Sequence, residues 1–168
     1  HNVEGAKGIL NDLGLEDNIF LSFLPLSHSY EHMAGQFVPI SIGAEIYYAE
    51  GIESLAKNMQ EARPTIMTAV PRLYETMYQR IKTGVQNNGG FKEKLFNKTY
   101  QLGRKRYEKN GDFGLLETFQ DKVLDKLVRQ KVRNRFGGRL KALVSGGAPL
   151  NPEIGIFFTS LGLRILQG

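Results

Sequence analysis

Short apolar runs that end in a proline-containing turn occur three times in this chain of 168 residues. The first run leads into Pro25, the second into Pro71, and the third into a turn that contains Pro149. Each run has the length of a buried strand, and apolar residues at helical spacing follow each turn. This alternation predicts an α/β fold in which a mostly parallel β-sheet is flanked by helices.

The apolar pattern also predicts where the individual strands and helices lie. Asn151 is a good N-cap and Pro152 suits a first helical position, so one helix is expected to begin there. Two helices, at 91–109 and 115–135, form an inserted helical hairpin within a segment of about 85–138. The predicted strands are 19–24, 46–48, 64–70, 140–144 and 163–166, and the other predicted helices are 3–11, 28–42, 52–59, 71–86 and 152–161. The second hairpin helix carries an apolar stripe at helical spacing: Leu116, Phe119, Val123 and Leu127.

Composition excludes several classes of protein. Apolar residues make up 41% of the chain and charged residues 23%, as in ordinary globular domains. No apolar run is long enough to span a bilayer. The sequence contains no cysteine, which excludes disulfides, a thiol nucleophile and a cysteine-based metal site, and fits a cytoplasmic location.

Positive charge is concentrated in one segment of the sequence. Residues 92–141 hold 15 of the 22 Lys and Arg residues but only 6 of the 17 Asp and Glu residues. Most such segments are solvated helix faces, and we favour that interpretation here. Peripheral contact with a membrane surface is the alternative that we retain. No nucleic-acid-binding motif accompanies the segment, so no nucleic-acid partner is expected.

Two histidines follow the first strand. His28 lies where an imidazole could orient the carboxylate of a substrate, although it could equally cap the next helix. His32 lies one helical turn further on, but His-Ser-Tyr-Glu-His is not the zinc-binding pattern His-Glu-x-x-His, and no metal site is expected. Ser27 and Ser29 lack the glycines of a nucleophile elbow, so a serine hydrolase is not indicated.

The turn after residues 140–144 is rich in glycine, with the sequence Ser145-Gly146-Gly147-Ala148-Pro149. Two glycines allow a flat ligand to approach the backbone, whose peptide groups could bond the edge of a base. A tight turn with positive φ is the alternative explanation. The turn has neither of the glycine patterns that mark phosphate loops.

The turn after residues 64–70 brings Arg72 to the start of a helix. Its guanidinium could meet an anion there. It could also pair with Glu75, three residues further on, and we favour this structural role.

Together the three turns resemble those of the AMP-forming acyl-CoA synthetases, members of the adenylate-forming superfamily. The segments that carry the resemblance are Leu24–His32, Thr68–Glu75 and Val144–Leu150, followed by Gln167-Gly168. These segments and the helical insertion are most similar to those of long-chain fatty acid–CoA ligases. The resemblance extends along residues 1–168 and implies that the chain is part of an adenylate-forming fold.

The resemblance also implies that the chain is a single internal piece of the large N-terminal domain. The family's Ser/Thr/Gly-rich phosphate loop would precede His1, and the Thr and Glu of its Tyr-Gly-x-Thr-Glu motif would follow Gly168. The small C-terminal domain with its catalytic lysine would also lie elsewhere. We therefore assign no catalytic residue here and expect the piece alone to be inactive.

The implied reaction is a two-step ligation. A fatty carboxylate attacks ATP, with Mg²⁺ assisting, and coenzyme A thiolate then displaces AMP from the acyl-adenylate. His28 matches the position beside the acyl carboxylate and the adenylate, and Tyr30, Met33 and Phe37 would line the acyl tunnel. The positions that match the adenine and AMP site are Gly146, Gly147, Ala148, Pro149, Gln167 and Gly168.

Two other functions remain open at this stage. A fatty acyl-AMP ligase would form the same adenylate but transfer the acyl group to a carrier protein. A non-catalytic module would instead bind its partner through the basic helices. AMP release that depends on coenzyme A distinguishes the first alternative. Binding to duplex nucleic acid with a steep dependence on salt would support the second, whereas binding to anionic vesicles would suit a ligase that takes fatty acids from a membrane surface.

Overall fold

The computed structural model describes residue 14, residues 18–109 and residues 113–167, so the helix predicted at 3–11 lies outside the described residues. The sheet has the order β2-β1-β3-β4-β5, and each neighbouring pair of strands is parallel. The prediction of an α/β fold built on a parallel sheet is therefore confirmed. The strands are β1 (Ile19–Ser22), β2 (Glu45–Tyr48), β3 (Ile66–Ala69), β4 (Ala142–Ser145) and β5 (Ile165–Gln167).

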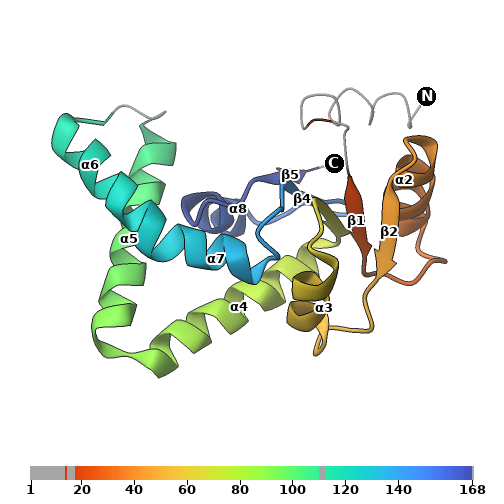
Figure 1. The fold of residues 1–168 in the computed structure, drawn as a ribbon, viewed down its shortest axis with the longest axis horizontal. Coiled ribbons are helices and arrows are strands. Elements are labelled where there is room, and N and C mark those ends of the chain that lie inside the picture. The colour runs from red at the N-terminus through yellow and green to blue at the C-terminus, as the bar shows by residue number, and fades with distance from the viewer. Residues whose placement is uncertain (1–13, 15–17, 110–112, 168) are drawn as a thin grey trace.

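Helical segments connect the strands and cover both faces of the sheet (Figure 1). Between β1 and β2 the chain forms η1, a π-helical segment (Glu31–Phe37), and α2 (Val38–Ser41). This connection leads from β1 outward to the edge strand β2, whereas the later connections lead toward β5. Because both kinds of crossover are right-handed, they lie on opposite faces of the sheet. The later segments are α3 (Leu55–Ala62), α4 (Pro71–Asn88), α5 (Gly90–Glu108), α6 (Leu115–Leu124), the π-helical η2 (Asp125–Arg129), α7 (Gln130–Arg135) and α8 (Pro152–Ser160).

Successive strand residues point to opposite faces and so build two apolar cores. Leu21, Met67 and Leu143 contribute to the larger core, which includes side chains of α3, α4 and α8. Phe20 and Ile66, their neighbours in sequence, pack in a smaller core with Val38 of α2. Since all four residues of β3 are buried, this strand has the continuous apolar character expected of a central parallel strand.

Both helix starts predicted at a proline are confirmed. Pro71 is the first residue of α4, and Pro152 is the first residue of α8. Asn151 caps α8, because its Oδ1 accepts a hydrogen bond of 2.9 Å from the N–H of Glu153. The apolar stripe that follows Asn151 is buried throughout and consists of Ile154, Phe157, Phe158 and Leu161.

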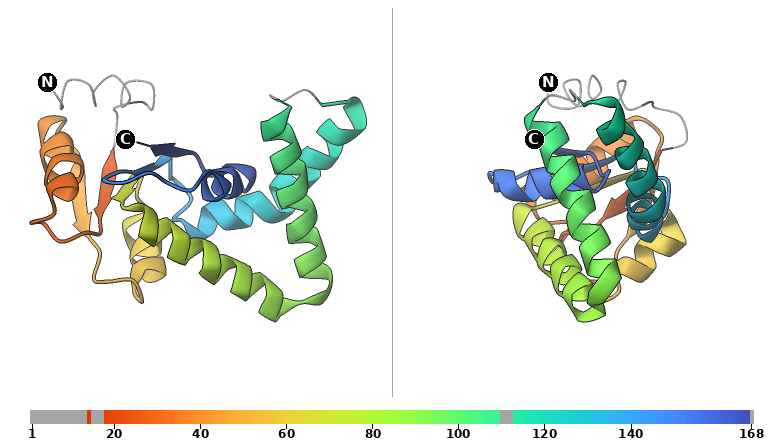
Figure 2. Two further views of the ribbon diagram at one scale, coloured as in Figure 1. Left: turned by 180° about the vertical axis from the view of Figure 1, so that it is seen from behind. Right: turned by 90° about the vertical axis from the view of Figure 1, so that its left-hand side faces the viewer.

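The hairpin of α5 and α6 projects from the sheet, as Figure 2 shows from two further directions. Ion pairs from Lys105 to Glu117 and from Arg106 to Asp121 link its two arms. The apolar stripe of α6 lies in no core: Leu116 is 70% exposed and Phe119 is 66% exposed. Even so, within the described ranges no helix combines the length and apolarity needed to cross a membrane.

Gly103 allows α5 to lie directly against α8. A Cβ atom at this position would be 2.6 Å from the carbonyl oxygen of Ser160 and 2.7 Å from its Cα. Because these are backbone atoms, Gly103→Ala is expected to push the helices apart and lower the free energy of unfolding by about 1–3 kcal/mol. Urea denaturation measures the change.

Gly84→Ala is the matched control for this prediction, because a Cβ on Gly84 of α4 would meet no atom within 4 Å. Alanine favours a helix interior by about 1 kcal/mol over glycine, so this variant should be slightly stabilised. If both variants are stabilised alike, the close contact of α5 with α8 is not tight in solution.

Candidate functional site

Polar side chains stand at the carboxyl ends of the apolar strands. Ser22 ends β1 and is in register with Thr68 of β3, while Ser145 ends β4 and is in register with Gln167 of β5. Ser22, Thr68 and Ser145 are all buried. In open parallel sheets the crevice at this edge is where ligands bind. The strand register therefore lines up hydroxyl groups at the edge where a ligand is expected.

Glu31 is a fully buried carboxylate that lies against this edge. It is the first residue of η1, and Ser22 Oγ donates a 2.6 Å hydrogen bond to its Oε1. Gly35 makes room for it, since a Cβ on Gly35 would lie 1.8 Å from Glu31 Oε1. In the π-helical turn the N–H of Val38 donates to the carbonyl of Met33, five residues earlier. The next residue, Pro39, has no N–H to donate.

Three buried polar atoms at this edge lack a hydrogen bond of normal geometry to any described residue. They are Oε2 of Glu31, Oγ1 of Thr68 and Oγ of Ser145. Buried polar atoms without a partner are costly and rare in folded proteins. Their gathering at the ends of β3 and β4 indicates a place where a ligand or water completes the hydrogen bonding.

Burial also shifts the acidity of the side chains at this edge. It raises the pKa of the Glu31 carboxyl above its ordinary value, partly offset by hydrogen bonding from Ser22, from the backbone of Leu24 and, more weakly, from Thr68. Burial, together with the nearby charge of Glu31, raises the pKa of Tyr30 to about 12. Tyr74 is completely buried, which raises its pKa well above the usual range. Both tyrosines are therefore neutral hydrogen-bond donors at physiological pH.

The two tyrosine hydroxyls are directed at one carbonyl of β4. Tyr74 donates to the carbonyl oxygen of Val144 at 3.0 Å, and Tyr30 donates to the same oxygen at 3.4 Å. Tyr30 also lies across Gly146, where a Cβ would be only 2.1 Å from Cε2 of the tyrosine ring. Glycine is thus required at position 146 for the Tyr30 ring to pack on the backbone after β4.

Gly147 is the point at which all three turns meet. It has a φ of +81°, which favours glycine. A Cβ built on it would lie 3.8 Å from Cε1 of His28, in the first turn, and 3.7 Å from Cγ1 of Val70, in the second. The structure therefore brings together the three segments that the sequence pattern singled out.

His28 bonds the backbone just ahead of η1, as its structural interpretation would have it. Its Nδ1 accepts a hydrogen bond of 3.3 Å from the N–H of Tyr30. Its ring is exposed beside Gly147. The contact of this ring with a substrate stays a prediction. The ring of His32 packs edge-on against Phe37 at 4.7 Å between centroids.

The other predicted site residues have mixed surroundings. Phe37, one of the predicted tunnel residues, is 50% exposed, and Ile40 in the same predicted helix is 63% exposed, because only one face of the segment meets the sheet. Met33 is half-buried. The ion pair expected between Arg72 and Glu75 is absent from the described residues. Ala148, Pro149 and Gln167 are exposed at the strand edge, and Gly168 lies outside the described residues.

Sequence reasoning missed four residues of this edge: Ser22, Glu31, Thr68 and Tyr74. Ser22 and Thr68 had a visible signal, because each is a lone hydroxyl residue near the end of an otherwise apolar strand. Glu31 directly follows Tyr30 in the sequence, but glutamate is rarely buried, so its charge predicts a surface position. Tyr74 lies within a predicted helix, where its spacing gives no sign of a polar role, and only the structure shows its hydroxyl bonded to the backbone of β3 and β4.

The buried carboxyl of Glu31 should make stability depend on pH. Because the folded pKa is raised, the carboxyl stabilises the fold most when protonated, and this contribution is lost as the pH rises through the folded pKa. Glu31→Gln keeps an oxygen that accepts from Ser22. It should therefore gain stability relative to the wild type as the pH rises above about 4.5, the ordinary value.

Urea denaturation at a series of pH values measures this difference. Glu75→Gln is the control, since Glu75 is exposed on α4. If the stability of wild type and Glu31→Gln changes with pH in parallel, Glu31 is not buried in solution as it is here.

Comparison with known proteins places the chain in a family. A family model described as AMP-binding enzyme matches residues 1–168. The peroxisomal long chain acyl-CoA synthetase 6 of Arabidopsis thaliana is 34% identical over 153 residues, which are 90% of this chain and 21% of that protein. The long-chain-fatty-acid–CoA ligase FadD15 of Mycobacterium tuberculosis is 31% identical over 173 residues, covering 100% of this chain and 28% of that protein. The chain thus spans about a fifth to a quarter of the length of these relatives.

Solved structures share the fold. The A-PCP didomain of a carboxylic acid reductase from Segniliparus rugosus, in complex with AMP, aligns with a TM-score of 0.63 and 23% identity over 99% of this chain and 20% of that one. The adenylation domain of a carboxylate reductase from Mycobacterium chelonae aligns with a TM-score of 0.61 and 23% identity over 90% of this chain and 20% of its own. The arrangement of strands and helices is therefore that of part of an adenylation domain.

Proposed function

The chain belongs to the AMP-binding enzyme family, and on that premise we propose that it forms the adenylate-binding part of a long-chain fatty acid–CoA ligase. In this proposal the chain is the middle part of a larger N-terminal domain, with its helical insertion at about 85–138. Curated relatives named as long-chain acyl-CoA synthetases or ligases support the choice of substrate class.

The observation that carries the proposal is the meeting of three turns at Gly147. His28 from the first turn and Val70 from the second border the glycine loop of the third. At the same edge, Oγ of Ser145 has no hydrogen-bond partner among the described residues, and the hydroxyl of Thr68 has only the Glu31 carboxyl beside it. A flat, polar ligand such as an adenylate fits a site that combines an accessible glycine backbone with unsatisfied hydrogen-bonding groups.

Each predicted residue then has a role in the first step. The backbone of Gly146 and Gly147, with Ala148 and Pro149, would lie against the adenine, and Gln167 and Gly168 would lead into the AMP site. His28 would sit beside the acyl carboxylate, with Nε2 free for it because Nδ1 accepts from the N–H of Tyr30. Tyr30, Met33 and Phe37 would border the start of the acyl chain. The reaction then joins the carboxylate to AMP and releases pyrophosphate.

The remaining cofactors would be held by other parts of the protein. Mg²⁺ would neutralise charge on the ATP phosphates. Across the described ranges, no group of three or more His, Asp or Glu residues is placed to hold a metal ion, so we assign no step to the metal. Coenzyme A would enter for the second step. The basic segment 92–141 would hold a cytoplasmic enzyme at an anionic membrane surface.

Two assays of the complete protein test the proposal. ATP–pyrophosphate exchange should depend on a long-chain fatty acid, and coenzyme A should then release AMP. Exchange without release by coenzyme A would instead identify a ligase that loads a carrier protein. The absence of exchange with every chain length would refute adenylation of fatty acids, and a binding module acting through the basic helices would become the better explanation.

A further inference from the structure

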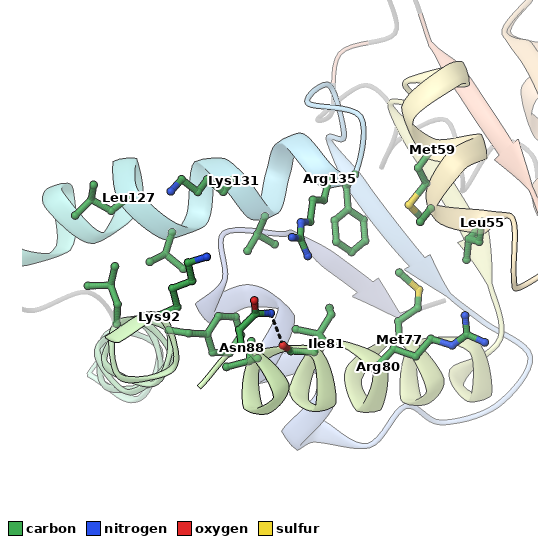
Figure 3. Close-up of a pocket in the computed structure, with 18 of the residues that line it drawn as sticks. Leu55, Met59, Met77, Arg80, Ile81, Asn88, Lys92, Leu127, Lys131 and Arg135 are labelled. Atoms are coloured by element: carbon green, nitrogen blue, oxygen red, sulfur yellow. Dashed lines mark hydrogen bonds between the residues drawn. The ribbon is translucent and has the colours of Figure 1, made fainter. Parts of the chain in front are cut away.

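A separate cavity lies among the helices, away from the residues at the strand edge. Its volume is about 540 Å³, within the range of small-molecule sites, and side chains of α3, α4, α5, η2 and α7 line it (Figure 3). None of the residues that meet at Gly147 belongs to its lining. The cavity is therefore a candidate site in its own right.

The walls of this cavity are mainly apolar. The apolar residues of the lining include Met59 of α3, Met77 and Ile81 of α4, Phe96 of α5, Val128 of η2 and Phe136. An apolar cavity of this size suits a flexible hydrocarbon chain, because burial of each methylene group is favourable and methionine side chains adapt to irregular shapes.

The charged groups around the cavity are all cationic. Arg80, Lys92, Lys131 and Arg135 contribute to the lining, and among the described residues that line the cavity none is acidic. Arg80 is already engaged, since it pairs with Glu53 and donates to the carbonyl of Ile52. Within the described part of the chain, the other three cations make no ion pair.

The three unpaired cations come from facing walls. Figure 3 shows Lys131 and Arg135 on the wall formed by α7, and Lys92 on the opposite wall at the start of α5, with Arg135 directed into the space between them. All three side chains are exposed, so solvent screens their mutual repulsion. An anionic group bound there would be complementary to all three.

The apolar stripe of α6 leads to the same cavity. Leu116, Phe119 and Val123 are exposed along α6, and Leu127, the next residue of the stripe, is both exposed and part of the cavity lining. An apolar track on the surface thus continues into an apolar cavity bordered by cations. This arrangement fits a ligand with a long apolar tail better than a compact anion such as phosphate.

We propose that this cavity binds a single-chain anionic amphiphile, with its tail between α3, α4 and α5 and its head at Lys92, Lys131 and Arg135. The site is distinct from the proposed adenylate site. The inference does not depend on ligase activity, because it rests on the lining of the cavity and on its charges.

Binding of the fluorescent 18-carbon fatty acid cis-parinaric acid to the complete protein, without ATP, tests this proposal. The double variant Lys131→Gln/Arg135→Gln should weaken one binding step by roughly tenfold or more. The matched control is Lys122→Gln/Lys126→Gln, which removes the same charge from exposed positions outside the lining and should leave that step unchanged. Ile81→Trp, which fills the cavity, should abolish the step.

Several outcomes would overturn the proposal. Equal weakening by both double variants would show attraction to overall charge, and equal binding of hexadecyltrimethylammonium would show that the head group is not recognised. The absence of a step sensitive to Ile81→Trp would mean that no amphiphile enters. If Lys131→Gln/Arg135→Gln abolished ATP–pyrophosphate exchange in parallel, the cavity would be the acyl site of the enzyme itself. Retained binding in a protein without exchange would refute the proposed ligase but not this site.

Discussion

Replacing Arg129 by methionine is expected to lower the free energy of unfolding by about 3 kcal/mol, because it breaks a buried ion pair. Arg129 is only 5% exposed, and its Nη2 lies 2.8 Å from Oδ1 of Asp121, which is 7% exposed. Its Nε also donates a 2.8 Å hydrogen bond to the carbonyl of Ser160. One side chain of η2 therefore ties α6 to the end of α8.

The loss should come mainly from the partners that Arg129 leaves behind. Asp121 would keep its contact with Arg106 at 2.7 Å, but its Oδ1 would lose its ion-pair partner and the Ser160 carbonyl would lose its hydrogen-bond donor. A second substitution, Asp121→Leu, removes the stranded carboxylate, so Arg129→Met/Asp121→Leu should recover much of the loss. Urea denaturation of the single and double variants gives the coupling energy.

The control for this prediction is Arg106→Met, on the same carboxylate. The side chain of Arg106 is 58% exposed, so losing its ion pair should change stability by less than about 1 kcal/mol. If Arg106→Met and Arg129→Met are equally destabilising, burial does not distinguish the two contacts. Strictly additive effects of Arg129→Met and Asp121→Leu would show that the pair is not coupled.

The strands could be predicted because their signal is local. Each consists of a short apolar run bounded by a turn, and the run at 64–70 contains the observed strand β3 (Ile66–Ala69). The observed strands are shorter than the predicted runs, because the hydrogen bonds between strands stop where a turn begins. Pro71 and Pro152 were equally reliable, because proline at a first helical position needs no partner for the N–H that it lacks.

The exposure of the α6 stripe could not be predicted from its spacing. Periodicity shows that Leu116, Phe119, Val123 and Leu127 share one helix face, but it does not show what covers that face. Here the face is exposed, with only Leu127 reaching the cavity among the helices. What packs against a stripe depends on segments distant in the sequence, which the pattern of one helix does not encode.

The convergence of the three turns followed from topology, but the chemistry at their meeting point did not. Parallel strands bring their carboxyl ends to one edge, so the sequence places the turns together. The burial of Glu31 depends instead on a hydroxyl from β1 and on the missing side chain of Gly35. Ser22 and Glu31 are nine positions apart, and Glu31 and Gly35 lie four apart in a π-helical turn. A regular helical pattern predicts neither arrangement.

Gly146→Ala is expected to reduce fatty-acid-dependent ATP–pyrophosphate exchange of the complete protein by about 100-fold, with the proposed function as its premise. The added Cβ would lie 2.1 Å from Cε2 and 2.4 Å from Cζ of Tyr30. An aromatic ring cannot yield by bending, so Tyr30 must leave its place beside Val144 or the glycine loop must shift. Either movement displaces groups at the point where His28, Val70 and Gly147 meet, and a displacement of about 1 Å is enough for a loss of this size.

Removal of the clash provides the sharpest test of this explanation. Tyr30→Ala takes away the ring, so adding Gly146→Ala to it should cause much less further loss than Gly146→Ala causes in the wild type. Gly155→Ala on α8 is the control, since its Cβ would meet ordinary contacts of 3.9 Å or more. Thermal melts of all variants separate loss of the site from loss of the fold. If the exchange rate of Gly146→Ala stays within about twofold of the wild type, and the variant is as stable as the wild type in thermal melts, then Tyr30 and the glycine loop do not shape the adenylate site.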